Sequence, residues 1–168
     1  MSDIRIVSKA DLRETIADWF LKDNGDLDEG AELATLVKVC LMTDRLALPD
    51  DVLPDPDSSD RRGWWGDLDA DVIWDGWPTG SRLWLLERAK ITDADAQEGS
   101  TVFRVEEYCR EALQPLINKR YCSYIDVKAE RTEIGRIEAT IKIFRGPKEE
   151  IELRFQDLWS EEADDEPW

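Results

Sequence analysis

Two stretches of the chain carry apolar residues at the three- and four-residue spacing of a helix. The first predicts a helix from Leu33 to about Thr43, and the second predicts a helix from about Val102. Because Pro115 cannot donate a hydrogen bond to the carbonyl of Glu111, we expect a kink or an early end there. The apolar positions are Leu33, Leu36, Val37, Cys40 and Leu41 in the first helix, and Val102, Val105, Cys109, Ala112 and Leu116 in the second.

After residue 120 the apolar period changes to two, which is typical of strands with one buried face. Residues 121–131 and 136–145 alternate, Gly146-Pro147 predicts a turn, and residues 151–155 alternate again. This pattern predicts an antiparallel meander. Since helices come first and strands last, we predict an α+β fold, a two-layer domain with helices packed on one face of a small antiparallel C-terminal sheet.

Three weaker signals lie in the first half of the chain. IRIV (4–7) alternates and predicts a short strand, whereas residues 17–30 are rich in turn formers. The segment SRLWLLERAK (81–90) predicts a short helix, capped by Ser81 or Thr79.

The stretch from residue 44 to residue 80 has no regular period and holds four of the seven prolines. A loop of this length in a compact domain is usually functional or a linker. Its tryptophans argue against a free linker, because they would be poorly soluble there; they are Trp64, Trp65, Trp74 and Trp77. They form either an interface or a cover for the domain's own core. We expect one domain over residues 1–159 and an acidic, mobile tail over residues 160–168.

The formal net charge of −17 narrows the classes of partner that the chain can bind. Such a field repels nucleic acid and anionic lipid, and it attracts basic proteins. No apolar run is long enough to span a bilayer, and the first residues lack the apolar region of a signal peptide. The three cysteines lack metal-ligand spacing, so we expect reduced thiols in a cytoplasmic protein.

The chain lacks the usual parts of an enzyme site. It has no histidine, no phosphate-binding glycine loop and no zinc spacing. Asn24, Asp26 and Asp28 alternate as calcium ligands do, but Gly30 falls one position too late for an EF-hand. We therefore expect no enzyme activity, no metal and no cofactor. The alternative function is a tryptophan-rich module that binds a small ligand or a carbohydrate.

Several motifs, taken in order, resemble the baseplate protein of Mu-like contractile-tailed phages and prophages. They are GDL (25–27), LMTDR (41–45), SDRRGWWGD (59–67), GSRLWLLERAK (80–90) and EYCREAL (107–113). That family resembles the lysozyme-like wedge proteins, which include the phage protein called W. Leu41, Thr43, Arg45, Trp65 and Gly66 match the order of residues in that wider group. Its Glu-Pro-Arg motif is replaced here by Ile117-Asn118-Lys119, for which Lys119 or Arg120 is the candidate substitute.

The resemblance implies a structural wedge subunit without cell-wall hydrolysis, located in the virion tail baseplate and assembled in the bacterial host cytoplasm. It implies six copies around the tail axis, contacts with helical-bundle wedge proteins, and initiation of the tail sheath by strand addition. The edge that accepts a sheath strand is expected around residues 151–155 or 121–129. The candidate partner-binding residues are Arg61, Arg62, Trp64, Trp65, Gly66, Arg82, Trp84, Lys119, Arg120, Ile151, Leu153 and Phe155.

The motif DRRGWWGD (60–67) raises a specific question, because two large apolar rings are adjacent in a loop. We expect Trp64 and Trp65 either to point one into the domain and one toward a neighbour, or both to fix the loop over the helix that carries Trp84. Gly63 and Gly66 are expected to let the backbone turn sharply. The two arginines before them suit the carboxylates of a partner.

Overall fold

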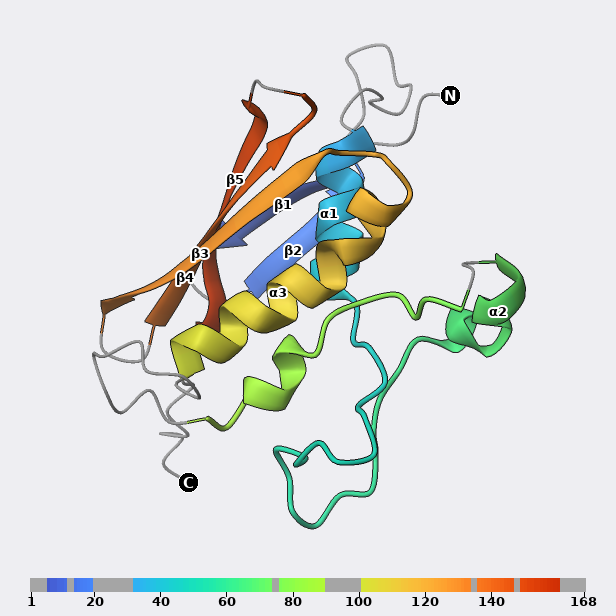
Figure 1. The fold of residues 1–168 in the computed structure, drawn as a ribbon. Coiled ribbons are helices and arrows are strands. Elements are labelled where there is room, and N and C mark those ends of the chain that lie inside the picture. Colours follow the sequence, from blue (N-terminus) through green and yellow to red (C-terminus); the bar gives the residue numbers. More distant parts are fainter. Residues whose placement is uncertain are drawn as a thin grey trace.

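The computed structural model of the protein describes residues 6–11, 14–19, 32–73, 76–89, 101–133, 136–146 and 149–160. Figure 1 shows the helix α3 lying across one face of a three-stranded sheet, with α1 beside it. The long loop leaves this helical layer on the side away from the sheet. This arrangement confirms the predicted α+β fold.

The two long helices form where the apolar stripes predict them. The helix α1 spans Glu32–Met42 and buries its stripe, with Val37 fully enclosed. The helix α3 spans Thr101–Asn118. It continues past Pro115, so the expectation of an early end at the proline is wrong. Pro115 removes one hydrogen bond of the helix, to the carbonyl of Glu111, and the helix continues for three residues beyond it.

The predicted meander is present. Strand β3 spans Tyr124–Glu133, β4 spans Arg136–Phe144 and β5 spans Glu149–Ser160. They pair antiparallel in the order β3-β4-β5, so β4 is central. The alternating positions of β3 and β4 that were predicted to be apolar-inward are buried: Ile125, Val127, Ala129, Ile137, Ala139, Ile141 and Ile143. Tyr121 and Ser123 precede β3 and are exposed, so the predicted strand began too early.

The core lies between this face of the sheet and the helices. Leu113 and Val105 of α3 meet the isoleucines of β4 in one apolar cluster, which Leu86 from the loop completes. Burying each such side chain contributes about 1.5–3 kcal/mol. The core thus fixes α3 on the sheet and holds the end of the loop against α3.

The first half of the chain departs more from the predictions. Strand β1 spans Ile6–Asp11 and pairs antiparallel with β2, which spans Glu14–Trp19. The strand expected at 4–7 therefore begins later, and β2 includes residues that were assigned to a turn-rich segment. The proposed turn at Asn24-Gly25 and the acidic tail beyond Ser160 lie outside the described residues.

The described connection after α1, residues 43–73 and 76–89, is called the loop below and contains three short helical turns. The 3₁₀ helix η1 spans Trp65–Asp69, the helix α2 spans Ala70–Ile73, and the 3₁₀ helix η2 spans Leu83–Leu86. The first two were not predicted, because four or five residues are too few to show a period. The helix predicted over 81–90 is only η2 within the described residues, and its N-cap residue, Arg82, makes no side-chain capping hydrogen bond.

Candidate interaction site

The loop is attached to the end of α1 by a short two-stranded contact. The amide of Ser81 donates to the carbonyl of Thr43 (2.9 Å), and the amide of Arg45 donates to the carbonyl of Ser81 (3.0 Å). The Ser81 hydroxyl, expected to cap a helix, donates to the carbonyl of Leu41 (2.7 Å) and accepts a long hydrogen bond from the amide of Leu83, the first residue of η2 (3.4 Å). Gly80 has φ +108°, and a Cβ atom there would lie 2.4 Å from the Thr43 oxygen, so this contact requires glycine.

A charged cluster joins the loop to α3. Arg82 donates to Glu111 through Nη2 (2.7 Å) and through Nε, and to Asp51 through Nη1 (2.9 Å). Its guanidinium also lies over the ring of Tyr108, 4.6 Å from the ring centre. Burial lowers the pKa of Arg82, but the hydrogen bonds and charges of Glu111 and Asp51 outweigh it and raise the pKa above its ordinary value. The group therefore remains charged although its side chain is 12% exposed.

Arg45 extends this cluster toward the tryptophans. Its Nη1 lies 3.1 Å from Glu111, an ion pair whose geometry does not make a hydrogen bond. Its guanidinium is 5.3 Å from the ring centre of Trp77, and its carbonyl accepts a hydrogen bond from the indole of Trp84 (2.9 Å). Trp84 itself is buried. The candidate residues Arg82 and Trp84 thus hold the loop on the domain.

The two arginines of the tryptophan motif make bonds within the chain. Arg62 lies over the Trp84 ring, 4.7 Å from the ring centre, and pairs with Asp44 (2.8 Å) and Glu87 (2.9 Å). The backbone carbonyl of Arg61 accepts a hydrogen bond from the amide of Ala47. Both residues fold the loop back toward α1. Whether they also contact a partner stays a prediction.

The adjacent tryptophans have different environments. The ring of Trp64 is half-buried and lies against Gly66, where a Cβ atom would be 2.4 Å from the ring. Trp65 is 78% exposed, and the two ring centres are 5.4 Å apart. Gly63 has positive φ, as expected, but Gly66 does not, so its role is to make room for Trp64 rather than to turn the chain.

Two further exposed apolar side chains follow Trp65 and were missed. Leu68 is 89% exposed and Val72 is 84% exposed. They lie three and seven residues after Trp65, which places all three on one side of η1 and α2. We call these three residues the Trp65 stripe. The spacing is visible in the sequence, but the segment is too short for periodicity to separate it from a loop.

The sheet has two edges that differ in structure. At β3, the amide of Ala129 donates to Glu106 (2.9 Å) and the carbonyl of Val127 accepts from Arg110 (2.8 Å). Glu106 and Arg110 also pair with each other on α3 (2.7 Å). Since an amide has one proton, Ala129 does not bond to β4, and these α3 side chains cover part of the β3 edge.

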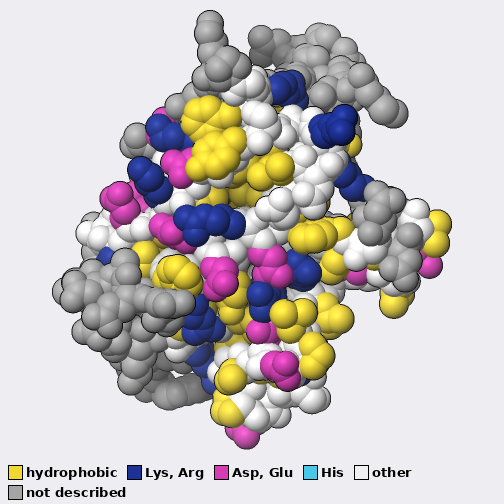
Figure 2. Space-filling view, viewed as in Figure 1, with side chains coloured by type: hydrophobic (Ala, Val, Ile, Leu, Met, Phe, Trp, Pro, Cys, Tyr) yellow, Lys and Arg dark blue, Asp and Glu magenta, His cyan; other side chains and the backbone are white. Residues whose placement is uncertain are grey.

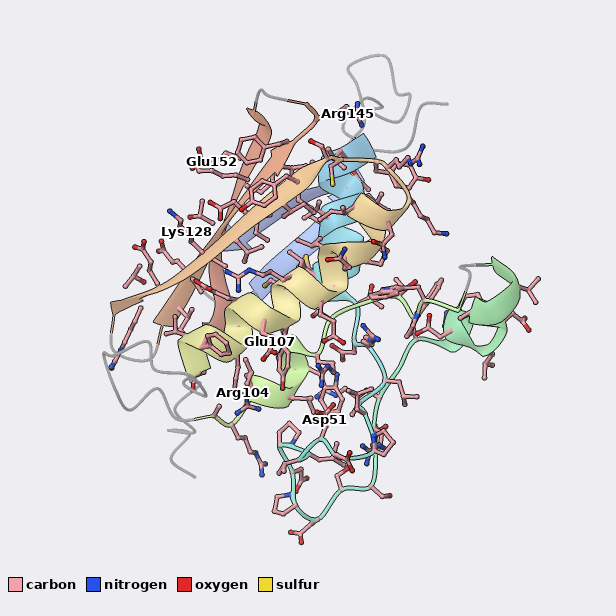
Figure 3. The ribbon with its side chains drawn as sticks, in the orientation of Figure 1. Asp51, Arg104, Glu107, Lys128, Arg145 and Glu152 are labelled. Carbon is pink, nitrogen blue, oxygen red and sulfur yellow. The ribbon has the colours of Figure 1, made fainter. Side chains whose placement is uncertain are left out.

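The β5 edge carries the other candidate residues. Leu153 packs against the core, and Glu152 pairs with Lys142 of β4 across the sheet (3.3 Å). Figure 3 labels Glu152 on the arm of the sheet farthest from the loop. The side chains of Ile151 and Phe155 lie outside the described residues, although their backbone belongs to β5. Among the described strands β5 pairs only with β4.

Lys119 and Arg120 directly follow Asn118, the last residue of α3. Arg120 has φ +62°, its amide donates to Ile117 (3.0 Å), and the next amide, of Tyr121, donates to Leu116 (2.9 Å). This is the Schellman pattern of a helix C-terminus. Both basic side chains are exposed. The structure thus gives Arg120 a role in the turn into β3.

Other chemistry has little support in the described part of the chain. There, no group of three or more acidic, cysteine or histidine side chains is placed to hold a metal ion. The three cysteines are free and buried, and burial raises the pKa of Cys40 to about 11 and that of Cys109 to about 12. None of the described helices is long and apolar enough to cross a membrane.

The fold and these surfaces define a small α+β protein in which, among the described strands, β5 is at the edge of the sheet, and in which η1 and α2 form an exposed apolar lobe. The sequence model of the family described as phage protein GP46 matches residues 33–150, and the chain belongs to this family. The chain is also similar to the baseplate protein gp46 of Escherichia phage Mu, with 43% identity over 114 residues, which covers 68% of this chain and 70% of that protein. The resemblance to the Mu-like baseplate protein is thereby confirmed.

Proposed function

We propose that this chain is a structural component of a phage tail baseplate. The observation that carries this proposal is its 43% identity with a protein named as a baseplate protein over most of both chains. Within that role we assign it as a wedge subunit, in six copies around the axis of a contractile tail, next to helical-bundle wedge proteins. Its location would be the virion baseplate, after assembly in the host cytoplasm.

We further propose that β5 accepts an extended strand from the first ring of sheath subunits. Two edges were candidates, and the covering of Ala129 and Val127 by α3 side chains favours β5 over β3. An edge strand presents unpaired backbone donors and acceptors, which a partner strand can use. The acidic residues Glu149, Glu150 and Glu152 disfavour pairing with a second copy and favour a basic strand.

Proline substitutions test this assignment. Glu152→Pro or Arg154→Pro removes an amide proton from β5, which an edge strand tolerates where that proton points outward. Residues two apart in a strand present their amides to the same side, and Glu152 and Arg154 are in regular register with β4. We therefore expect both variants to fold, to enter baseplates and to fail to start sheath polymerisation. Glu152→Ala is the matched control, because it keeps the amide, and it should assemble sheath normally. Thr140→Pro in the central strand β4 should unfold.

Sheath counts on purified tails by electron microscopy, together with thermal melting of each variant, give the readout. Normal sheaths on folded versions of both proline variants would contradict strand addition at β5. Absence of the wild-type chain from baseplates, checked by mass spectrometry of the same tails, would contradict the broader proposal.

The exposed ring of Trp65 keeps a carbohydrate-binding module as the second candidate, because aromatic faces also bind sugars. Titration with glycans, followed by tryptophan fluorescence, separates the two. Saturable quenching that Trp65→Ala abolishes, in a protein absent from tails, would favour the module.

A further inference from the structure

The Trp65 stripe lies on a lobe that stands away from the body of the protein. Figure 1 shows α2 at the far end of the loop, separated from the sheet by the helical layer. In Figure 2, yellow hydrophobic side chains and magenta acidic ones lie together at the outer end of this lobe. Trp65, Leu68 and Val72 are each more than three-quarters exposed. Large apolar side chains grouped in this way mark interaction surfaces.

Hydrogen bonds and a ring contact within the lobe order its backbone, and they leave the Trp65 stripe exposed. The backbone amide of Thr79 donates to the carboxylate of Asp67 (2.9 Å), which closes the base of the lobe. The amide of Gly76 donates to the carbonyl of Ala70 (3.0 Å) after α2, and Ala70 is buried. Trp64 packs against Gly66 on the inner side. A surface that is already ordered loses less entropy on binding, so the lobe is suited to docking as it stands.

The acidic residues around the stripe indicate what kind of partner surface it would fit. Residues 65–75 contain four aspartates and no lysine or arginine. Asp69 lies between the apolar positions and its side chain is exposed, and the whole chain has a formal charge of −17. A second copy of this chain would bring one acidic surface against another. A partner with lysines and arginines around an apolar groove would instead complement both features.

We propose that the Trp65 stripe inserts into an apolar groove with a basic rim on a neighbouring protein of the particle. This inference rests on the proposed baseplate role, but it concerns a surface separate from the β5 edge. Trp65 is the central anchor, since exposed tryptophans commonly supply much of the binding energy of an interface. Leu68 and Val72 extend the contact along one helical side, and the exposed carboxylate of Asp69 meets the rim.

Site-specific crosslinking identifies the partner. A photoreactive phenylalanine analogue replaces Leu68 in the full chain, which is produced together with the other tail proteins. After irradiation, mass spectrometry identifies the crosslinked protein and the residues that were attached. We expect one other protein of the particle, captured at a segment that contains basic and apolar residues. Crosslinking to a second copy of this chain, or no crosslink in particles that contain the chain, would overturn the proposal.

The partner protein identified by the crosslink is then purified, and its affinity for variants of this chain measures how much each side chain contributes to binding. Trp65→Ala and Leu68→Ala should each weaken binding at least tenfold, whereas Val52→Ala, an equally exposed control outside the lobe, should change it less than twofold. Asp69→Lys should weaken binding, and Asp57→Lys, an exposed control on another part of the loop, should not. Wild-type affinity for both stripe variants would overturn the proposal. Failure of the baseplate role is recognised separately, by absence of the wild-type chain from particles.

Discussion

Removing the charge of Glu111 should destabilise the protein strongly, because this carboxylate stands between two largely buried arginines. Glu111 accepts two hydrogen bonds from Arg82 and forms an ion pair with Arg45. The arginine side chains are 12% and 10% exposed. In Glu111→Gln, Arg82 keeps its ion pair with Asp51, whereas Arg45 loses the ion pair that it forms within the described residues. Breaking a buried pair by removing one partner costs about 3–5 kcal/mol.

A neighbouring residue gives the matched control. Glu107, labelled in Figure 3, lies one turn before Glu111 on α3, and its side chain is exposed. Glu107→Gln makes the same chemical change on the same helix, and it should alter stability by less than about 0.5 kcal/mol. Asp51→Asn should cost about 1.5–3 kcal/mol, because Arg82 then keeps both hydrogen bonds to Glu111.

Urea unfolding followed by tryptophan fluorescence measures these differences. The midpoint should fall for Glu111→Gln and remain near wild type for Glu107→Gln, with the slope unchanged in both. A loss of less than about 1 kcal/mol for Glu111→Gln would refute the reasoning, because the two arginines would then find solvent or other partners without cost.

Three further predictions concern stability and pH. Gly80→Ala should lower the melting temperature, because it forces a Cβ atom onto the Thr43 carbonyl and a side chain into positive φ, and calorimetry checks this. Trp64→Ala should lower the unfolding free energy, whereas Trp65→Ala should leave it within about 0.5 kcal/mol; equal effects in urea unfolding would contradict their different burial. The folded-state pKa of Cys109 is raised to about 12 from 9.0, so its contribution to stability is complete below about pH 9 and is lost as the pH rises toward 12. Urea midpoints between pH 8 and 11 should therefore fall less in Cys109→Ala than in wild type.

The elements predicted from periodicity are those long enough to repeat it. Helices α1 and α3 show several turns of one apolar stripe, and β3 and β4 alternate over nine or ten residues. Their core positions could therefore be assigned in advance. The turns η1 and α2 could not, since each covers little more than one turn. Strand β2, which pairs with β1, was missed because its last residues were assigned to the turn-rich segment 17–30.

The candidate site was predicted as a region but not as a set of contacts. The motif around Trp64 was recognisable as unusual, but no local rule separates its inward ring from its outward one. Arg82 and Glu111 are 29 residues apart in the chain, so their pairing depends on tertiary structure. Likewise, the difference between the two sheet edges arises from Glu106 and Arg110, whose helical spacing suggests only an ordinary surface pair.

The motifs that connect this chain to its family divide into two groups by their surroundings. Arg45, Gly80, Arg82 and Glu111 all lie at the junction of α1, α3 and the loop, where each has a contact within the chain. Substituting one of them would alter how the lobe is held on the domain, although these residues do not form the exposed surface of the lobe. Trp65, in contrast, has little contact to lose in the isolated protein. The buried cluster therefore determines where the lobe stands, and the exposed stripe determines what it can bind, so defects of the two groups should separate into loss of folding and loss of assembly.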